Sequence, residues 1–241
     1  IIDNVCVSSK DRQTPDCPYY RRCGGCAFRH MSYSEELRAK TNRVNDALHR
    51  LGGLDVSITH VCGSEKTEAY RNKATYFAGL GNKLGFYRAR SHDLQRAERC
   101  ILQDEYADKC RNAIERWMRD FSIPVYDEKK GVGLLRSVQV RSCSGGILVS
   151  LVCTSEKVPD SDELCKYLRE ECNVLAGIVI NVHSGKGNTI LGGRNIVLWG
   201  NGFVDDNMCG MNFRISTNSF YQINRPQAEK IYKRAAELIQ P

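Results

Sequence analysis

The sequence has 241 residues, of which 41% are hydrophobic and 12 are cysteines, and its formal net charge is +7. This length is enough for one large or two modest domains, and the chain is too long and too poor in cysteine for a disulfide scaffold. No apolar run approaches the ~18 residues of a membrane span and no secretory signal is present, so the free cysteines indicate a reducing cytoplasm.

Both ends of the sequence look cut, because it begins at Ile1 rather than at Met and its last helical pattern stops at Pro241. We therefore expect a piece of a longer polypeptide. The charge is uneven: residues 1–100 hold 17 Lys and Arg against 11 Asp and Glu, which is +6 of the total +7.

Three cysteines, Cys17, Cys23 and Cys26, stand at C-x5-C-x2-C spacing, with two glycines between the last pair. A C-x-x-C turn points two sulfurs at one centre, and the glycines let backbone N–H groups approach what is bound. A four-ligand site needs one more thiolate, for which Cys100 is the candidate. Sets of four cysteines hold zinc or an iron–sulfur cluster. The single knuckle with a distant fourth cysteine favours the cluster, and unliganded thiols are the remaining alternative.

A capping box formed by Ser32 and Glu35 predicts a helix that runs to about Leu51. We expect this helix to pack on the cysteine loop; contact of its basic face with RNA is the alternative. Strands are predicted over 56–61 and 70–78, and the second of these forms a hairpin with 84–87. Asp104 caps a predicted helix that ends near Phe121, and Cys110 belongs to the apolar stripe of that helix, which excludes it from the metal site.

In the second half of the sequence, apolar and polar residues alternate over short runs, as in a β-rich domain, and one short helix is predicted over 160–171. Its predicted strands are 134–143, 147–153, 174–182, 188–191, 196–199 and 213–216. This order of elements predicts an α+β fold with a largely antiparallel sheet and flanking helices.

Residues 70–100 carry seven basic and two acidic side chains, with five aromatic residues interleaved. Basic groups that meet phosphates and rings that stack on bases are typical of surfaces for single-stranded or looped nucleic acid. A solvated basic face with its rings in the core is the alternative.

The segment Ser219–Asn224 precedes a helical pattern for which Asn224 is a suitable N-cap. Core packing is one interpretation of Phe220 and Tyr221. Gln222 is harder to assign to the core, because a side-chain amide beside a helix start can read the edge of a base or a cofactor. No G-x-G-x-x-G fingerprint and no Walker A loop occurs, so the spacing alone predicts a metal-clipped, RNA-binding unit rather than a complete enzyme.

Several stretches together resemble one family, in the right order along nearly the whole chain. They are the cysteine motif 17–26, Tyr70-Arg71-Asn72-Lys73, Gly85-Phe86-Tyr87, Cys100, Asn188-Thr189-Ile190-Leu191 and Ser219-Phe220-Tyr221-Gln222-Ile223-Asn224. The chain resembles the S-adenosylmethionine-dependent RNA 5-methyluridine methyltransferases, and among them the 23S ribosomal RNA uracil-5-methyltransferases that carry a 4Fe–4S cluster.

The resemblance implies a 4Fe–4S cluster on Cys17, Cys23, Cys26 and Cys100 that is a structural clip and part of an RNA-binding surface. It divides the chain into a cluster region (1–55), a central α+β RNA-recognition domain (56–224) and the start of a linker helix (225–241). A Rossmann-like catalytic domain is expected to be absent from this chain.

In this family a cysteine thiolate attacks C6 of the target uracil, C5 takes the methyl group from S-adenosylmethionine, and a carboxylate removes the C5 proton. The resemblance implies that nucleophile and base lie beyond Pro241. It assigns Gln222 to S-adenosylmethionine or the methylated uracil, Phe220 to RNA bases, and Arg71 and Lys73 to RNA. Ribosomal RNA is the expected partner, without an obligate protein partner, and the fragment alone is expected to be inactive. A non-catalytic RNA-binding module with a four-cysteine metal clip is the alternative.

Overall fold

The structure is a computed structural model that describes residues 4–185 and 189–239. In chain order, its elements are α1 (Tyr33–Asp46), the π-helical turn η1 (Ala47–Leu51), β1 (Lys73–Gly79), β2 (Lys83–Tyr87), β3 (Leu94–Gln95), α2 (Glu105–Asp120), β4 (Leu135–Cys143), β5 (Gly146–Cys153), α3 (Ser161–Glu171), β6 (Leu175–Val182), β7 (Arg194–Gly200), β8 (Phe203–Met208), β9 (Met211–Ser216) and α4 (Arg225–Ile239).

Strands β1 to β7 form one sheet in the order β3-β2-β1-β4-β5-β6-β7, and β8 pairs with β9 in a separate hairpin. Neighbouring strands of the sheet are antiparallel except β5 and β6, which run parallel. The connection between these two contains α3, as a parallel crossover requires. The prediction of an α+β fold with a mostly antiparallel sheet is therefore confirmed. The absence of a Rossmann-like domain stays a prediction, as do the domain boundaries at 55 and 224.

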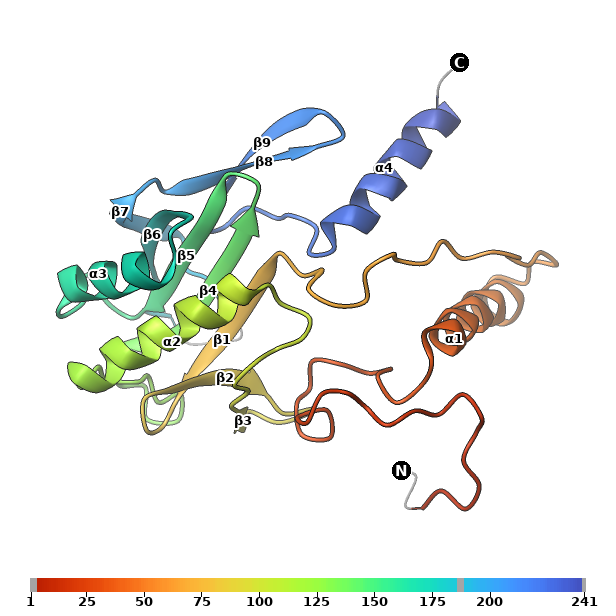
Figure 1. Cartoon of the computed structure of the whole chain (residues 1–241), viewed down its shortest axis with the longest axis horizontal. Coiled ribbons are helices and arrows are strands. Elements are labelled where there is room, and N and C mark those ends of the chain that lie inside the picture. Colours follow the sequence, from red (N-terminus) through yellow and green to blue (C-terminus); the bar gives the residue numbers. More distant parts are fainter. Residues whose placement is uncertain (1–3, 186–188, 240–241) are drawn as a thin grey trace.

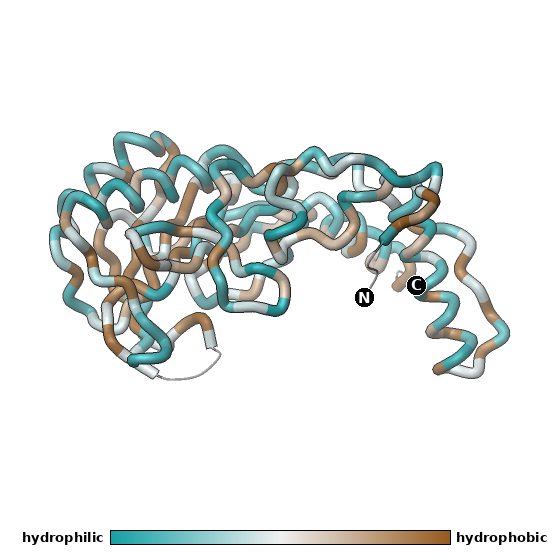
Figure 2. Tube along the Cα trace, turned by 90° about the horizontal axis from the view of Figure 1, so that it is seen from below, coloured by the Kyte–Doolittle hydropathy of each residue, from teal (hydrophilic) through white to brown (hydrophobic). Residues whose placement is uncertain are grey.

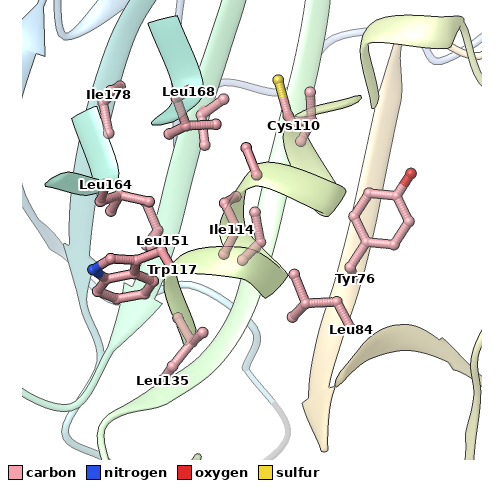
Figure 3. Packing of buried hydrophobic residues seen from close by; sticks show 14 of the residues in the cluster. Tyr76, Leu84, Cys110, Ile114, Trp117, Leu135, Leu151, Leu164, Leu168 and Ile178 are labelled. Carbon is pink, nitrogen blue, oxygen red and sulfur yellow. The ribbon is translucent and has the colours of Figure 1, made fainter. Parts of the chain in front are cut away.

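Helices α2 and α3 cover one face of the sheet, and the hydrophobic core lies between these helices and the strands (Figures 1 and 3). Asp104 caps α2 by accepting a hydrogen bond from the N–H of Ala107. Trp117 and Ile114 of this helix are fully buried against strand residues such as Leu151. Cys110 lies in the same core, which confirms that it belongs to the apolar stripe.

The opposite face of the sheet is partly covered by the β8–β9 hairpin, through a small cluster of Leu148, Val179, Val204 and Ile215. The rest of this face is polar, because side chains alternate along each strand and those opposite the core are mostly hydrophilic. We call it the polar face; it includes Lys73, Thr75, Phe77, Ser137, Gln139, Arg141, Ser150 and Asn181.

Residues 4–71 form an N-terminal portion that lies beside the sheet as one helix and long connecting segments (Figure 1). None of these residues is buried, and α1 contributes no buried side chain, so the expected packing of this helix on the cysteine loop creates no core. Figure 2 shows hydrophobic stretches gathered inside the sheet-and-helix part of the chain.

Three local predictions were wrong or incomplete. Residues 56–61 form no strand, because polar side chains of the helical segment bind their backbone: Asn45 hydrogen-bonds both the N–H and the C=O of Ile58, and His49 contacts the carbonyl of Val56. The strand predicted at 188–191 is not formed over 189–191, and Asn188 lies outside the described residues. Strands β3 and β8 were not predicted.

Helix α4 begins at Arg225 and projects away from the sheet (Figure 1). The predicted cap is confirmed, since the N–H of Gln227 donates to the Asn224 side chain at 3.3 Å. Within residues 4–185 and 189–239, none of the helices combines the length and the apolar composition that a membrane crossing needs.

Candidate functional site

The four predicted cysteine ligands, Cys17, Cys23, Cys26 and Cys100, line one cavity of about 60 Å³. Tyr19, Tyr20, Phe86, Ala97 and Leu102 are among the side chains that form its walls. Its lining therefore joins the N-terminal loop to the segment that follows β3, although 74 positions separate Cys26 from Cys100 in the sequence.

The glycine-rich loop is docked on the end of β2. The backbones of Cys23 and Arg88 form an isolated antiparallel β-bridge, and the N–H of Gly24 donates to the carbonyl of Tyr87 at 3.1 Å. A Cβ atom on Gly24 would lie 3.0 Å from the backbone of Tyr87 and of Ala89, tighter than side chains normally approach. Glycine is thus needed at this position because the loop and the strand end pack backbone against backbone.

The second side of the cysteine cavity is held by the start of α2. The N–H of Cys100 donates to the Asp108 carboxylate at 3.1 Å, and Tyr76 donates to the same side chain at 3.2 Å. Burial raises the pKa of Asp108, against the effect of these hydrogen bonds and of Arg111. The position of Cys100 is therefore fixed by the same helix that covers the core of the sheet.

The thiols of this cavity influence one another. Burial and the neighbouring Cys100, Cys23 and Cys17 raise the pKa of Cys26 to about 11. Burial also raises the pKa of Cys100. Since a metal ligand must be a thiolate, the raised pKa of Cys26 and of Cys100 opposes metal binding unless a cationic centre stabilises the thiolates.

The four cysteines supply the donor atoms of a four-thiolate centre, and they line a cavity. In the part of the chain that the structure describes, no three His, Cys, Asp or Glu side chains are grouped as they would be around a metal ion. Zinc draws its sulfurs to about 2.3 Å, whereas a cubane cluster holds each thiolate on a different iron. Four thiols that line one cavity are the type of donor that both centres use.

Two polar side chains that face the cysteine cavity have buried atoms without a hydrogen-bond partner among the described residues. They are Arg71, through Nε, and Gln103, through Oε1. Arg71 was predicted to contact RNA, and the structure places it in the lining of the cysteine cavity. A guanidinium at this position lowers the free energy of a negatively charged group inside the cavity.

Lys73 and Arg141 lie opposite each other on the paired strands β1 and β4, on the polar face. Burial lowers the pKa of both, and Lys73 also feels the charges of Arg141 and Arg71. Arg141 is only 2% exposed, and its Nε and Nη1 have no partner among residues 4–185 and 189–239. Within the same residues, no carboxylate forms an ion pair with Lys73 or Arg141. Burial thus disfavours the charged form of both side chains, and neither has a carboxylate counter-ion among the described residues.

The segment with the predicted Phe220 and Gln222 crosses the end of the polar face, and the strands fix its backbone. Arg141 donates to the carbonyl of Ser219 at 2.9 Å, and the Asn72 side chain donates to the carbonyl of Gln222 at 3.0 Å. The N–H of Asn72 donates to the carbonyl of the next residue at 3.1 Å. These contacts hold the backbone and leave the side chain of Gln222 exposed.

Phe220 is 85% exposed, so the interpretation that it packs in the core is wrong. Tyr221 instead packs beside the hairpin, where its hydroxyl donates to the buried carboxylate of Asp206 at 2.9 Å. Arg225, at the start of α4, pairs with the same carboxylate at 3.2 Å. Asp206 thus ties the hairpin, the exposed segment and α4 together.

Sequence reasoning missed Arg141, Asp206 and Gln103. A signal for the first was present, because Arg141 interrupts a strand in which most residues are buried. Asp206 and Gln103 carried no such signal, since neither interrupts a strand that the sequence predicted, and both are buried.

No protein-family model matches the chain. It is similar to curated bacterial proteins that are named uncharacterized RNA methyltransferases. The one from Clostridium tetani is 39% identical over 239 residues, which is 97% of this chain and 52% of the relative. The one from Clostridium acetobutylicum is 39% identical over 243 residues (98% and 53%), and the one from Listeria innocua is 35% identical over 241 residues (98% and 53%). The chain thus spans about half the length of the curated relatives it matches.

Among solved structures, the fold is similar to that of the Pyrococcus abyssi tRNA (uracil-54, C5)-methyltransferase in complex with S-adenosyl-L-homocysteine. The TM-score is 0.77 at 22% sequence identity, and the match covers 99% of this chain and 54% of the other. The two chains therefore share a fold over almost all of the present sequence.

Proposed function

We propose that this chain is the cluster-binding and RNA-recognition portion of an S-adenosylmethionine-dependent RNA (uracil-C5) methyltransferase. One observation carries the proposal: along almost its whole length, the chain has relatives named RNA methyltransferases and shares the fold of a tRNA (uracil-54, C5)-methyltransferase. A 23S ribosomal RNA substrate and a cytoplasmic location, both expected from the sequence, belong to the same proposal.

Cys17, Cys23, Cys26 and Cys100 are the residues that would hold a 4Fe–4S cluster. Their common cavity supports this assignment, as does the Nε of Arg71, which is buried and has no hydrogen-bond partner among the described residues. The absence of buried side chains over residues 4–71 supports it as well. When bound, the cluster supplies a covalent clip between two segments of chain, not a redox step. The chain's own residues then present the RNA-binding surface in a fixed orientation.

RNA recognition is assigned to the polar face and the segment that crosses it. Lys73 and Arg141 offer two partly or fully desolvated cations to a backbone phosphate, for which charge-assisted hydrogen bonds are strong. Phe220 offers an exposed ring for a base, and Gln222 offers an exposed amide to S-adenosylmethionine or to the target uracil. We assign the nucleophilic cysteine and the base to no residue of this chain.

The first test is the iron, zinc and acid-labile sulfide content of protein purified without air. We expect about four irons and four sulfides per chain. One zinc without sulfide would contradict the assignment and support a non-catalytic RNA-binding module with a four-cysteine metal clip.

The second test uses the full-length protein of which this chain is proposed to be a portion. It measures the transfer of labelled methyl groups from S-adenosylmethionine to 23S ribosomal RNA. Gln222→Ala should slow transfer by roughly 10- to 100-fold, because one hydrogen bond at the reacting end is lost. The matched control is Gln227→Ala, in the first turn of α4, which should leave the rate unchanged. Absence of transfer by the unaltered polypeptide to any RNA would overturn the proposed function.

A further inference from the structure

A second cavity, of about 280 Å³, opens on the polar face. Its lining comes from four separate parts of the chain: Phe77, Tyr87, His92, Glu128, Arg136, Ser137, Thr189 and Ile190. It shares no lining residue with the cysteine cavity. None of the roles assigned above uses it.

Two aromatic rings dominate the cavity. Phe77 and Tyr87, on the adjacent strands β1 and β2, stack with ring centroids 3.9 Å apart and planes inclined by 17°, and His92 lies against Tyr87 at 5.2 Å. Both aromatic residues are only partly buried, so they are not part of the core. Half-exposed flat rings at the mouth of a cavity are the surface on which an unstacked nucleobase stacks.

The polar groups around these rings are suited to the edge of a base. Arg136 stacks at 4.3 Å over the ring of Tyr126 and donates to the carbonyl of Gly185 at 2.8 Å, and these contacts stabilise its side of the cavity. Ser137 and Glu128 add a hydroxyl and a carboxylate, which together can donate to and accept from the hydrogen-bonding edge of a base.

The position of the cavity matches the spacing of a nucleic-acid chain. Phe77 and Lys73 lie on the same face of β1, four residues apart, which is about 13 Å along a strand. Ser137 and Arg141 repeat this spacing on β4, in register with them. An RNA chain whose phosphate binds Lys73 and Arg141 can therefore place a base, about two nucleotides away, over the rings of Phe77 and Tyr87.

We propose that this cavity binds a single unpaired nucleobase of the RNA, at a distance of a few nucleotides from the base presented to Gln222. The proposal rests on the proposed function, because it requires that the polar face binds RNA. The base stacks on the Phe77–Tyr87 pair, and Ser137 and Glu128 contact its edge. The cavity thereby adds to substrate choice without taking part in methyl transfer.

The test measures the affinity of the full chain for a single-stranded RNA of about 12 nucleotides and random sequence, over a series of salt concentrations. Tyr87→Leu and Phe77→Leu keep apolar bulk but remove a ring, and each should weaken binding by about 5- to 100-fold. The slope of log affinity against log salt should stay unchanged, because no phosphate contact is lost. Tyr87→Phe should restore the affinity.

The matched control is Tyr167→Leu, on α3 at the opposite side of the sheet, which should bind RNA as the unaltered chain does. A direct readout is photochemical cross-linking of the same RNA carrying 5-bromouridine, which should label the peptide that contains Tyr87. Circular dichroism melting of each variant identifies any that fail to fold.

The outcomes separate the two proposals. If the unaltered chain binds RNA and both leucine variants bind it equally well, the base site is overturned and the proposed function stands. Loss of affinity in Tyr167→Leu to the same extent would also overturn the base site. If the folded, unaltered chain binds no RNA at any salt concentration, the proposed function itself fails.

Discussion

The sheet portion and the N-terminal portion of this chain are stabilised in different ways. From β1 to β9, apolar side chains of strands and helices pack into a core that contains fully buried Trp117, Leu151 and Leu164. Residues 4–71 contain no buried side chain, and side-chain contacts such as the pair of Arg29 with Asp16 connect them. Exposed ion pairs contribute little, so this portion needs another source of stability.

The four cysteines lie at the junction of these two portions. The cavity of the four cysteines lies where the N-terminal portion meets the segment between β3 and α2. A bound cluster would join a portion without a core to one that has a core. The difference between the two portions therefore predicts that they respond differently to the same kind of change.

The largest expected effect comes from Cys100→Ser. Loss of one thiolate should release the iron, and hydrogen exchange should show loss of amide protection over residues 4–71 while β4, β5 and α2 stay protected. Cys62→Ser, an exposed cysteine outside the cavity, is the control and should keep its iron. Full iron content and normal protection in Cys100→Ser would show that the two portions do not depend on this ligand.

The second prediction applies one substitution to both portions. Leu151→Ala should lower the free energy of unfolding by about 2–5 kcal/mol, because it leaves a cavity in the core. Leu54→Ala, in the N-terminal portion and 51% exposed, should change it by no more than about 0.5 kcal/mol. Urea denaturation followed by circular dichroism measures both. Equal losses would contradict the contrast between the portions.

Asp206 lies between these two cases, because its side chain makes polar contacts, as in the N-terminal portion, but is fully buried, as in the core. Burial acts to raise its pKa, but hydrogen bonds from Ser144 and Tyr221 and the charge of Arg225 outweigh this, so the pKa lies below its ordinary value of 3.8. Asp206→Asn should cost about 1.5–3 kcal/mol at neutral pH, because hydrogen bonds to a charged group are lost.

The sign of the pH dependence follows from the lowered pKa of Asp206. The stabilisation by its carboxylate is fully present above the ordinary pKa of 3.8 and is lost as the pH falls through the lower pKa of the folded state. Urea denaturation of both proteins at a series of pH values should therefore show a difference that is constant down to about pH 4 and shrinks below it. A difference that grows with acid would exclude this role of Asp206.

The smallest effect concerns the polar face of the sheet. Lys73→Met should reduce the slope of log RNA affinity against log salt by about 0.7, the value for one phosphate contact with a single strand. Lys166→Met, on α3 and 60% exposed, is the matched control and should leave the slope unchanged. An unchanged slope in Lys73→Met would mean that its buried position serves the fold and not RNA.

Much of the local structure was predictable because it depends on neighbouring residues. Ser32 and Asp104 each accept a hydrogen bond from the backbone N–H three residues later, as their helix caps required. The strand predicted at 134–143 is confirmed as β4, whose Val138 and Val140 lie in the core. The strand predicted at 56–61 failed because β-rich composition needs a partner strand, and here the helix side chains occupy the backbone instead.

The candidate site was predictable in part for the same reason. The spacing of Cys17, Cys23 and Cys26 is a local pattern, and the structure brings these cysteines to one cavity. The ligand of that cavity and the role of Gln222 stay predictions. The exposure of Phe220 depends on how the 217–224 segment crosses the sheet, which no local pattern encodes.

The sequence by itself determined the helices and most strands, and it named four cysteines and several side chains as candidates for a metal site and for RNA contact. Only the tertiary structure decided which of these residues meet: that Arg71 faces the cysteine cavity, that Arg141 reaches Ser219, and that Phe77 stacks on Tyr87. The physical reason is that caps, turns and strand alternation involve atoms a few residues apart. Burial, desolvation and cavity walls instead arise when segments tens of residues apart pack together.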